Sequence, residues 1–148
     1  MDIIQRFIAY AGDFEKTLHD DDWARVKPYF ADDAVYEVKA ASFGCKLTGP
    51  DAICTGIKKS LDGFDRKFDR RDIEVIGAPE ADGDEMRLSW RIVYHKDGLA
   101  PYTLEGRSMA RYRDGKIAYL SDSYDSDVDA VFAAWGRENG LELDPSYT

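Results

Sequence analysis

The stretch YFADDAVYEV, residues 29–38, decides how the rest of the chain is interpreted, because it mixes acidic, apolar and aromatic residues. Its second half alternates in polarity, which predicts a strand over residues 34–39. Asp32 and Asp33 come just before that strand, where aspartate readily bonds nearby backbone in a turn. The stretch therefore predicts a turn leading into a first strand, and not a pair of catalytic carboxylates.

Helical spacing of apolar residues flanks this strand. On the N-terminal side, residues 2–18 are predicted to form an amphipathic helix. Its apolar stripe consists of Ile3, Phe7, Tyr10, Phe14 and Leu18. A short second helix is expected to carry Trp23, Val26 and Phe30 on one side. After a predicted loop over 40–48, Gly49-Pro50 opens a third helix that Gly63 ends.

The second half of the chain changes to a period of two. Met86, Leu88, Trp90, Ile92 and Tyr94 alternate with polar residues and predict a strand. Further strands are expected over 102–113 and 116–124, joined by a tight Asp114-Gly115 turn. A closing helix is predicted to end at Gly140, and residues 141–148 form a loose tail. Helices followed by a twisted antiparallel sheet define an α+β domain.

Composition limits the function. The net charge of −9 argues against a nucleic-acid partner, since phosphate binding needs clustered Lys and Arg. The densest basic group is Arg66, Lys67, Arg70 and Arg71; aspartates interrupt it, so a solvated connection is predicted there. No apolar run is long enough for a membrane span and no signal peptide is evident, which suggests the cytoplasm. Cys45 and Cys54 are expected as free thiols.

The order of these elements, with FADDAVYE in the first strand and SDSYD in the last, resembles the nuclear-transport-factor-two-like superfamily. Within it, the chain is most similar to the branch of SnoaL-like polyketide cyclases, steroid isomerases and limonene epoxide hydrolases. The resemblance implies a cystatin-like cone, in which a curved antiparallel sheet wraps around the N-terminal helices and encloses a small-molecule cavity. Residues 1–140 would form one such domain, and residues 141–148 a C-terminal tail.

The chemistry of the steroid isomerases does not carry over. The resemblance places their catalytic base at Val38, their tyrosine at Phe14 and their second oxyanion acid near Ser108. A valine cannot accept a proton and a phenyl ring cannot donate a hydrogen bond. Isomerase chemistry of that kind is therefore excluded on these residues.

The epoxide hydrolase pattern is retained in part. The resemblance matches Tyr36, Arg91 and Asp122 to three of its five polar residues, while Val38 and Val93 replace the other two. Alternation also opposes a cavity role for Arg91, because it puts Trp90 and Arg91 on opposite faces of one strand. Burial favours Trp90 on the cavity side. Arg91 remains in the predicted pocket only on the strength of the resemblance.

Asp122 and Tyr36 are the candidate catalytic residues. Asp122 shares a strand face with Leu120, and a buried carboxyl with few partners would have a raised pKa and suit general acid or base chemistry. Tyr36 shares a face with Val38 and would direct its hydroxyl into the same cavity. A structural hydrogen bond between tyrosine and aspartate would look the same from sequence.

The predicted function is cofactor-free acid/base chemistry of isomerase, cyclase or hydrolase type on a small hydrophobic molecule. The alternatives are a non-catalytic small-ligand binding protein and a dimerisation module, whose cavity would be filled by side chains. No cofactor and no metal site are expected, nor a nucleic-acid or membrane partner. A homodimer through the sheet is expected. The predicted pocket residues are Tyr10, Phe14, Val38, Trp90, Arg91, Ser108 and Leu120.

Overall fold

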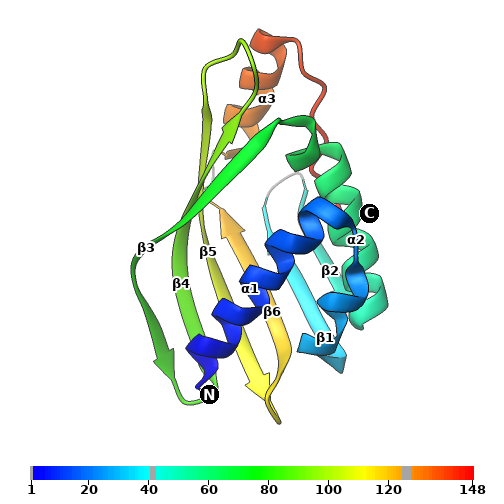
Figure 1. Ribbon diagram of the computed structural model, residues 1–148, viewed down its shortest axis with the longest axis vertical. Coiled ribbons are helices and arrows are strands. Elements are labelled where there is room, and N and C mark those ends of the chain that lie inside the picture. The colour runs from blue at the N-terminus through cyan, green and yellow to red at the C-terminus, as the bar shows by residue number, and fades with distance from the viewer. Residues whose placement is uncertain (1, 41–42, 125–127) are drawn as a thin grey trace.

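The computed structural model describes residues 2–40, 43–124 and 128–148, and Figure 1 shows the arrangement of its elements. The helices are α1 (Ile3–Asp20), α2 (Pro50–Gly63) and α3 (Val128–Asn139), with short 3-10 turns η1 (Trp23–Arg25), η2 (Lys27–Tyr29) and η3 (Asp65–Lys67). The strands are β1 (Phe30–Lys39), β2 (Cys45–Thr48), β3 (Arg70–Asp82), β4 (Glu85–His95), β5 (Tyr102–Arg113) and β6 (Lys116–Tyr124).

Six strands form one curved sheet in the order β2-β1-β6-β5-β4-β3. Four of the five neighbouring pairs are antiparallel, as expected, but β1 pairs with β6 in parallel. The prediction of a purely antiparallel sheet was therefore wrong for this pair. No tight turn joins β1 to β6, so chain connectivity does not impose an antiparallel direction on them. The sheet is mixed, and the α+β cone is confirmed.

The helices begin and end where local chemistry requires. Asp2 caps α1, because its side chain accepts a hydrogen bond from the backbone N–H of Gln5 while the Gln5 side chain accepts one from the backbone N–H of Asp2. Asp21, in the left-handed conformation, ends α1. Pro50 stands at the first turn of α2, and Gly63 is its last residue, as predicted.

Three local predictions need correction. The expected short helix is two 3-10 turns, because Pro28 lacks the N–H that a continuous helix would use. Phe30 belongs to β1, which begins four residues before the predicted strand. Within the predicted loop 40–48, the segment Cys45–Thr48 is strand β2, paired with β1.

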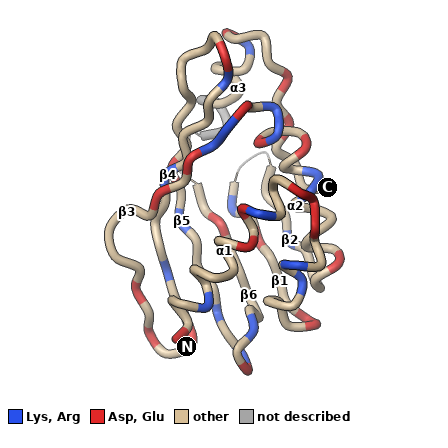
Figure 2. The backbone as a smooth tube through the Cα atoms, viewed as in Figure 1, with Lys and Arg blue, Asp and Glu red and all other residues tan. Residues whose placement is uncertain are grey.

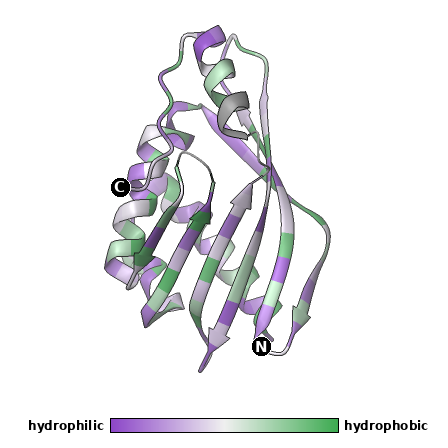
Figure 3. Ribbon diagram, turned by 180° about the vertical axis from the view of Figure 1, so that it is seen from behind, coloured by the Kyte–Doolittle hydropathy of each residue, from purple (hydrophilic) through white to green (hydrophobic). Residues whose placement is uncertain are grey.

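The helices α1 and α2 lie over one face of the sheet (Figure 1). Viewed from the opposite side, strands β1, β4, β5 and β6 present a face that no helix covers (Figure 3). Trp90 points to the helix side and is 6% exposed. Arg91 points to the outer side, where it pairs with Glu74 and Glu105, each at 2.9 Å. Alternation along β4 therefore predicted the correct faces.

Charged residues are dispersed over the elements (Figure 2). The outer face of the sheet carries ion pairs such as those of Arg91. A homodimer through this face stays a prediction, and its interface would include polar contacts. Among the helices of the described residues, none is both long and apolar enough to cross a bilayer.

The C-terminal tail is not loose. The Ser60 hydroxyl of α2 donates to the Pro145 carbonyl at 2.7 Å, and the backbone N–H of Asp144 donates to the Gly63 carbonyl at 2.9 Å. Gly63 also permits this contact sterically, because a Cβ there would lie 2.0 Å from the Asp144 carbonyl oxygen. These contacts fasten the tail along α2 and carry Tyr147 into the interior.

Candidate functional site

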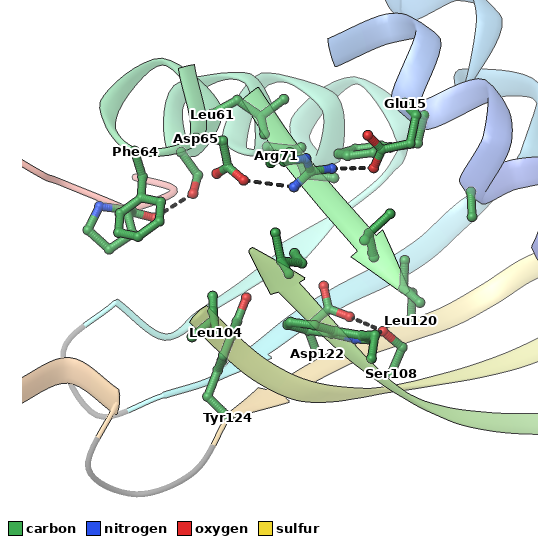
Figure 4. A pocket seen from close by; sticks show the side chains of 18 of the residues that line it. Glu15, Leu61, Phe64, Asp65, Arg71, Leu104, Ser108, Leu120, Asp122 and Tyr124 are labelled. Atoms are coloured by element: carbon green, nitrogen blue, oxygen red, sulfur yellow. Dashed lines mark hydrogen bonds and ion pairs between the residues drawn. The ribbon is translucent and has the colours of Figure 1, made fainter. Parts of the chain in front are cut away.

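A carboxyl group held by two hydroxyls forms the centre of the candidate site. The Tyr36 hydroxyl lies 2.5 Å from Oδ2 of Asp122, and the Ser108 hydroxyl lies 2.6 Å from its Oδ1. Sheet register brings them together, because Ser108 and Val38 are the two strand neighbours of Asp122, and Tyr36 lies two residues before Val38 on the same face of β1. Figure 4 shows the contact between Ser108 and Asp122.

The direction of one hydrogen bond follows from a third residue. The Trp90 indole N–H, which can only donate, lies 2.9 Å from the Ser108 oxygen. The Ser108 oxygen thus accepts from Trp90, and its proton is directed to Asp122. Gly106 makes room for this arrangement, because a Cβ at that position would lie 2.6 Å from the Trp90 ring.

Burial dominates the ionisation of Asp122. Protein atoms surround the carboxyl, and its remaining exposed surface borders the cavity. Loss of hydration raises the pKa of Asp122 above its ordinary value, while the hydrogen bonds from Ser108 and Tyr36 act in the opposite direction. Burial, followed by the charge of Asp122, raises the pKa of the Tyr36 phenol. The pair therefore favours a neutral phenol beside a carboxyl that is easier to protonate than usual.

A cavity of about 430 Å³ lies beside this carboxyl, between the sheet and the helices. Its size falls in the range of small-molecule sites, roughly 300–1,000 Å³. Of the predicted residues, Tyr10, Phe14, Tyr36, Trp90, Ser108, Leu120 and Asp122 line it. A dimerisation module with a cavity filled by side chains does not agree with this geometry.

Two predicted pocket residues do not line the cavity. Arg91 is on the outer face of β4, with 40% of its side chain exposed, because its neighbour Trp90 occupies the inner face. Val38 is buried on the inner face, but it packs in the core beside Asp122 without reaching the cavity. These two positions correct the sequence prediction.

Tyr147 of the tail lines the cavity and was missed. Its ring centroid lies 5.8 Å from that of Tyr36. Burial and then the charge of Asp122 raise the pKa of the Tyr147 phenol, and hydrogen bonding with Tyr36 and Ser60 lowers it by less. No periodicity in residues 141–148 indicates this position.

Arg71 was also missed, since the basic run around it predicts a solvated connection. Only 8% of its side chain is exposed, and it lines the cavity together with Ile73 and Val75 of the same strand. Alternation of these three residues along β3 is the signal that could have revealed it. Among the residues that the structure describes, no group of three or more His, Cys, Asp or Glu is placed to hold a metal ion.

Comparison with known proteins agrees with this geometry at the level of fold. TerC, crystallised with polyporic acid, is 17% identical, covers 88% of this chain and 95% of its own, and has a TM-score of 0.64. A proposed polyketide cyclase from Xanthomonas campestris pv. campestris is 18% identical, covers 87% of this chain and 96% of its own, and has a TM-score of 0.59. A protein with a ketosteroid isomerase-like fold from Catenulispora acidiphila, in complex with trimethylamine, is 19% identical, covers 79% of this chain and 85% of its own, and has a TM-score of 0.58.

The fold is therefore that of the nuclear-transport-factor-two-like and ketosteroid isomerase-like proteins. A family model for the SnoaL-like domain matches residues 11–120, and the chain belongs to this family. No curated protein matches the chain. Asp122 and Tyr147 lie beyond the matched residues.

Proposed function

We propose that the protein carries out cofactor-free acid/base chemistry on a small hydrophobic molecule, with Asp122 as the acid or base and Tyr36 as the orienting donor. The observation that carries this proposal is a carboxyl at the wall of an apolar cavity, bound by two hydroxyls and raised in pKa by burial. A raised pKa brings a carboxyl nearer the pH at which it can both accept and release a proton.

The two hydroxyls give the carboxyl two stable protonation states. When Asp122 is ionised, Tyr36 and Ser108 both donate to it. When Asp122 has taken a proton from the substrate onto Oδ2, that proton can be donated to the Tyr36 oxygen. The Tyr36 proton is then free to stabilise negative charge on a substrate oxygen. Proton uptake at Oδ2 of Asp122 thus makes the neighbouring Tyr36 hydroxyl available as a hydrogen-bond donor to the substrate.

Family membership supports small-molecule chemistry, and the likeness in fold to TerC, which was crystallised with polyporic acid, and to a proposed polyketide cyclase supports it as well. The residues argue against a steroid isomerase mechanism, because Val38 and Phe14 stand at the positions of its base and its tyrosine. The proposed chemistry therefore rests on Asp122 itself.

Non-catalytic binding of a small ligand is the second candidate. Each oxygen of Asp122 already accepts a hydroxyl proton, which is also what a structural carboxylate requires. In that case the cavity would bind the ligand and no proton would move.

Asp122→Asn separates the two candidates. We would screen aromatic ketones, beginning with 2-tetralone, and follow exchange of the protons next to the carbonyl in D₂O by NMR. Acid/base catalysis predicts a loss of about 10²–10⁴-fold in exchange rate in the variant. An equal rate in the variant would dismiss Asp122 as the base, and binding without exchange would support the second candidate.

Asp13→Asn is the matched control. The Tyr29 hydroxyl lies 2.5 Å from Oδ2 of Asp13, the same distance as in the Tyr36–Asp122 pair, but neither Asp13 nor Tyr29 lines the cavity. Its exchange rate should equal that of the unmodified protein.

The homodimer through the sheet belongs to the same proposal, and sedimentation equilibrium would measure it.

A further inference from the structure

A second polar group lies in the same cavity, on the side opposite Asp122 (Figure 4). Its centre is the Arg71 guanidinium, which donates from Nη1 to Asp65 at 2.7 Å and from Nη2 to Glu15. The three residues come from β3, η3 and α1, and all three line the cavity. We call them the Arg71 cluster.

The surroundings of the cluster fix its charge and position. The Tyr94 hydroxyl donates to Asp65 at 2.9 Å, and the Arg71 guanidinium carbon lies 5.8 Å from the centre of the Phe14 ring. Burial acts to lower the pKa of Arg71, but the nearby carboxylates of Asp65 and Glu15 hold it above its ordinary value. The guanidinium is therefore a permanent cation in an aromatic setting.

The cluster has a hydrogen-bonding capacity that the protein does not use. A guanidinium has five N–H donors, and the Nε of Arg71 is buried with no acceptor among the residues that the structure describes. A buried donor without a partner costs roughly 1–3 kcal/mol. Nε itself has no surface exposed to the cavity, but Nη1 and Nη2 each donate to one carboxylate and each has a second N–H, to which an oxygen atom of a bound molecule can bind.

The net charge of the cluster determines which kind of ligand oxygen can bind there. Two carboxylates and one guanidinium leave one negative charge, and Asp122 is a further acidic group on the same cavity. Among the described residues that line the cavity, Arg71 is the only basic one. A ligand carboxylate would be repelled there, whereas an uncharged carbonyl or ether oxygen accepts an N–H without adding charge.

We propose that the Arg71 cluster binds an uncharged oxygen acceptor, so that the ligand of this cavity is a neutral apolar molecule with a carbonyl or ether oxygen at the end that faces Arg71. The inference rests on the proposed function, because it assigns the substrate class for the same cavity. It adds that neutral ketones or esters bind and that the corresponding carboxylates do not compete.

Three probes of one shape test this by isothermal titration calorimetry. They are 2-acetylnaphthalene, which carries a neutral oxygen; 2-isopropenylnaphthalene, in which a carbon replaces that oxygen; and 2-naphthoate, which is charged. The ketone should bind about tenfold more tightly than the hydrocarbon, the value of one hydrogen bond to a charged group. It should also bind at least tenfold more tightly than the carboxylate.

Glu15→Gln is the decisive variant. The Glu15 side chain is 32% exposed, so its replacement should leave the fold intact, and the cluster then has no net charge. Affinity for 2-naphthoate should rise about tenfold, while affinity for the ketone should stay within twofold. An unchanged ratio of the two affinities would overturn the proposal.

Arg71→Gln should remove the preference for the ketone over the hydrocarbon. Arg91→Gln is the matched control, since Arg91 also pairs with two glutamates but lies on the outer face. If none of the probes binds, the cavity proposed above fails together with this inference. If the probes bind and the ketone has no advantage in the unmodified protein, only the Arg71 cluster is refuted.

Discussion

Replacement of Ser108 by alanine should destabilise the protein by an amount that depends on pH. The variant loses the hydroxyl that donates to Asp122 at 2.6 Å and accepts from Trp90 at 2.9 Å. The unpaired Trp90 N–H costs roughly 1–3 kcal/mol at every pH. The lost bond to Asp122 costs about 1.5–3 kcal/mol when the carboxyl is ionised and about 0.5–1.5 kcal/mol when it is neutral.

The direction in which stability changes with pH follows from proton linkage. The pKa of Asp122 is raised in the folded state, so the folded protein binds more protons than the unfolded chain in the interval between the two pKa values. Stability therefore falls as pH rises through that interval. Loss of the Ser108 donor raises the folded pKa of Asp122 further, so the variant should lose more stability than the unmodified protein. The extra loss above the titration of Asp122 is about 1–1.5 kcal/mol.

Urea denaturation at one pH below and one pH above the titration of Asp122 measures this difference, and the ¹³C resonance of the carboxyl locates the titration. The contribution of Trp90 cancels between the two pH values. Trp90→Phe serves as the control, because it removes the indole donor and should cost the same at both. If the cost of Ser108→Ala is equal at the two pH values, or smaller at the higher one, the assigned role of Ser108 as donor to Asp122 is refuted.

Two further predictions concern the tail and a thiol. Gly63→Ala should detach the tail, because a Cβ there would lie 2.0 Å from the Asp144 carbonyl oxygen, and limited proteolysis should then cleave residues 141–148 faster. Gly12→Ala, in open space on α1, should instead stabilise the protein by about 0.5–1 kcal/mol, measured in urea, and a loss of stability there would contradict this reasoning. Burial raises the pKa of Cys54 to about 11, so about a thousandth of it is thiolate at pH 8 and iodoacetamide should label it far more slowly than a free cysteine. Rapid labelling of Cys54 in the folded protein would show that this burial is wrong.

Local signals in the sequence predicted most of the fold. The alternation around Trp90 and the Asp114-Gly115 turn yielded the β5 and β6 bounds that the structure has. The parallel pairing of β1 with β6 was not predictable in this way, because it joins segments more than eighty residues apart. Periodicity shows which face a strand presents, and it does not show which strand lies beside it.

The same limit applies to the candidate site: alternation indicates the face on which a residue lies, but contacts between distant segments decide which residues meet. Tyr36 and Asp122 were assigned to a common cavity from alternation and resemblance, and the structure joins them by a hydrogen bond. Tyr147 was not predictable, because its position depends on contacts of the tail with α2. Arg71 was hidden by the aspartates around it, which made a buried guanidinium look like part of a solvated surface.

The tail has a practical consequence for redesign. Leu143 and Tyr147 pack against the core, and Pro145 and Tyr147 line the cavity, yet none of them takes part in strand pairing or in the matched residues 11–120. A combinatorial library at these three positions would reshape one wall while every ladder of the sheet stayed in register. Directed evolution of the ligand preference of this cavity can therefore begin in residues 141–148.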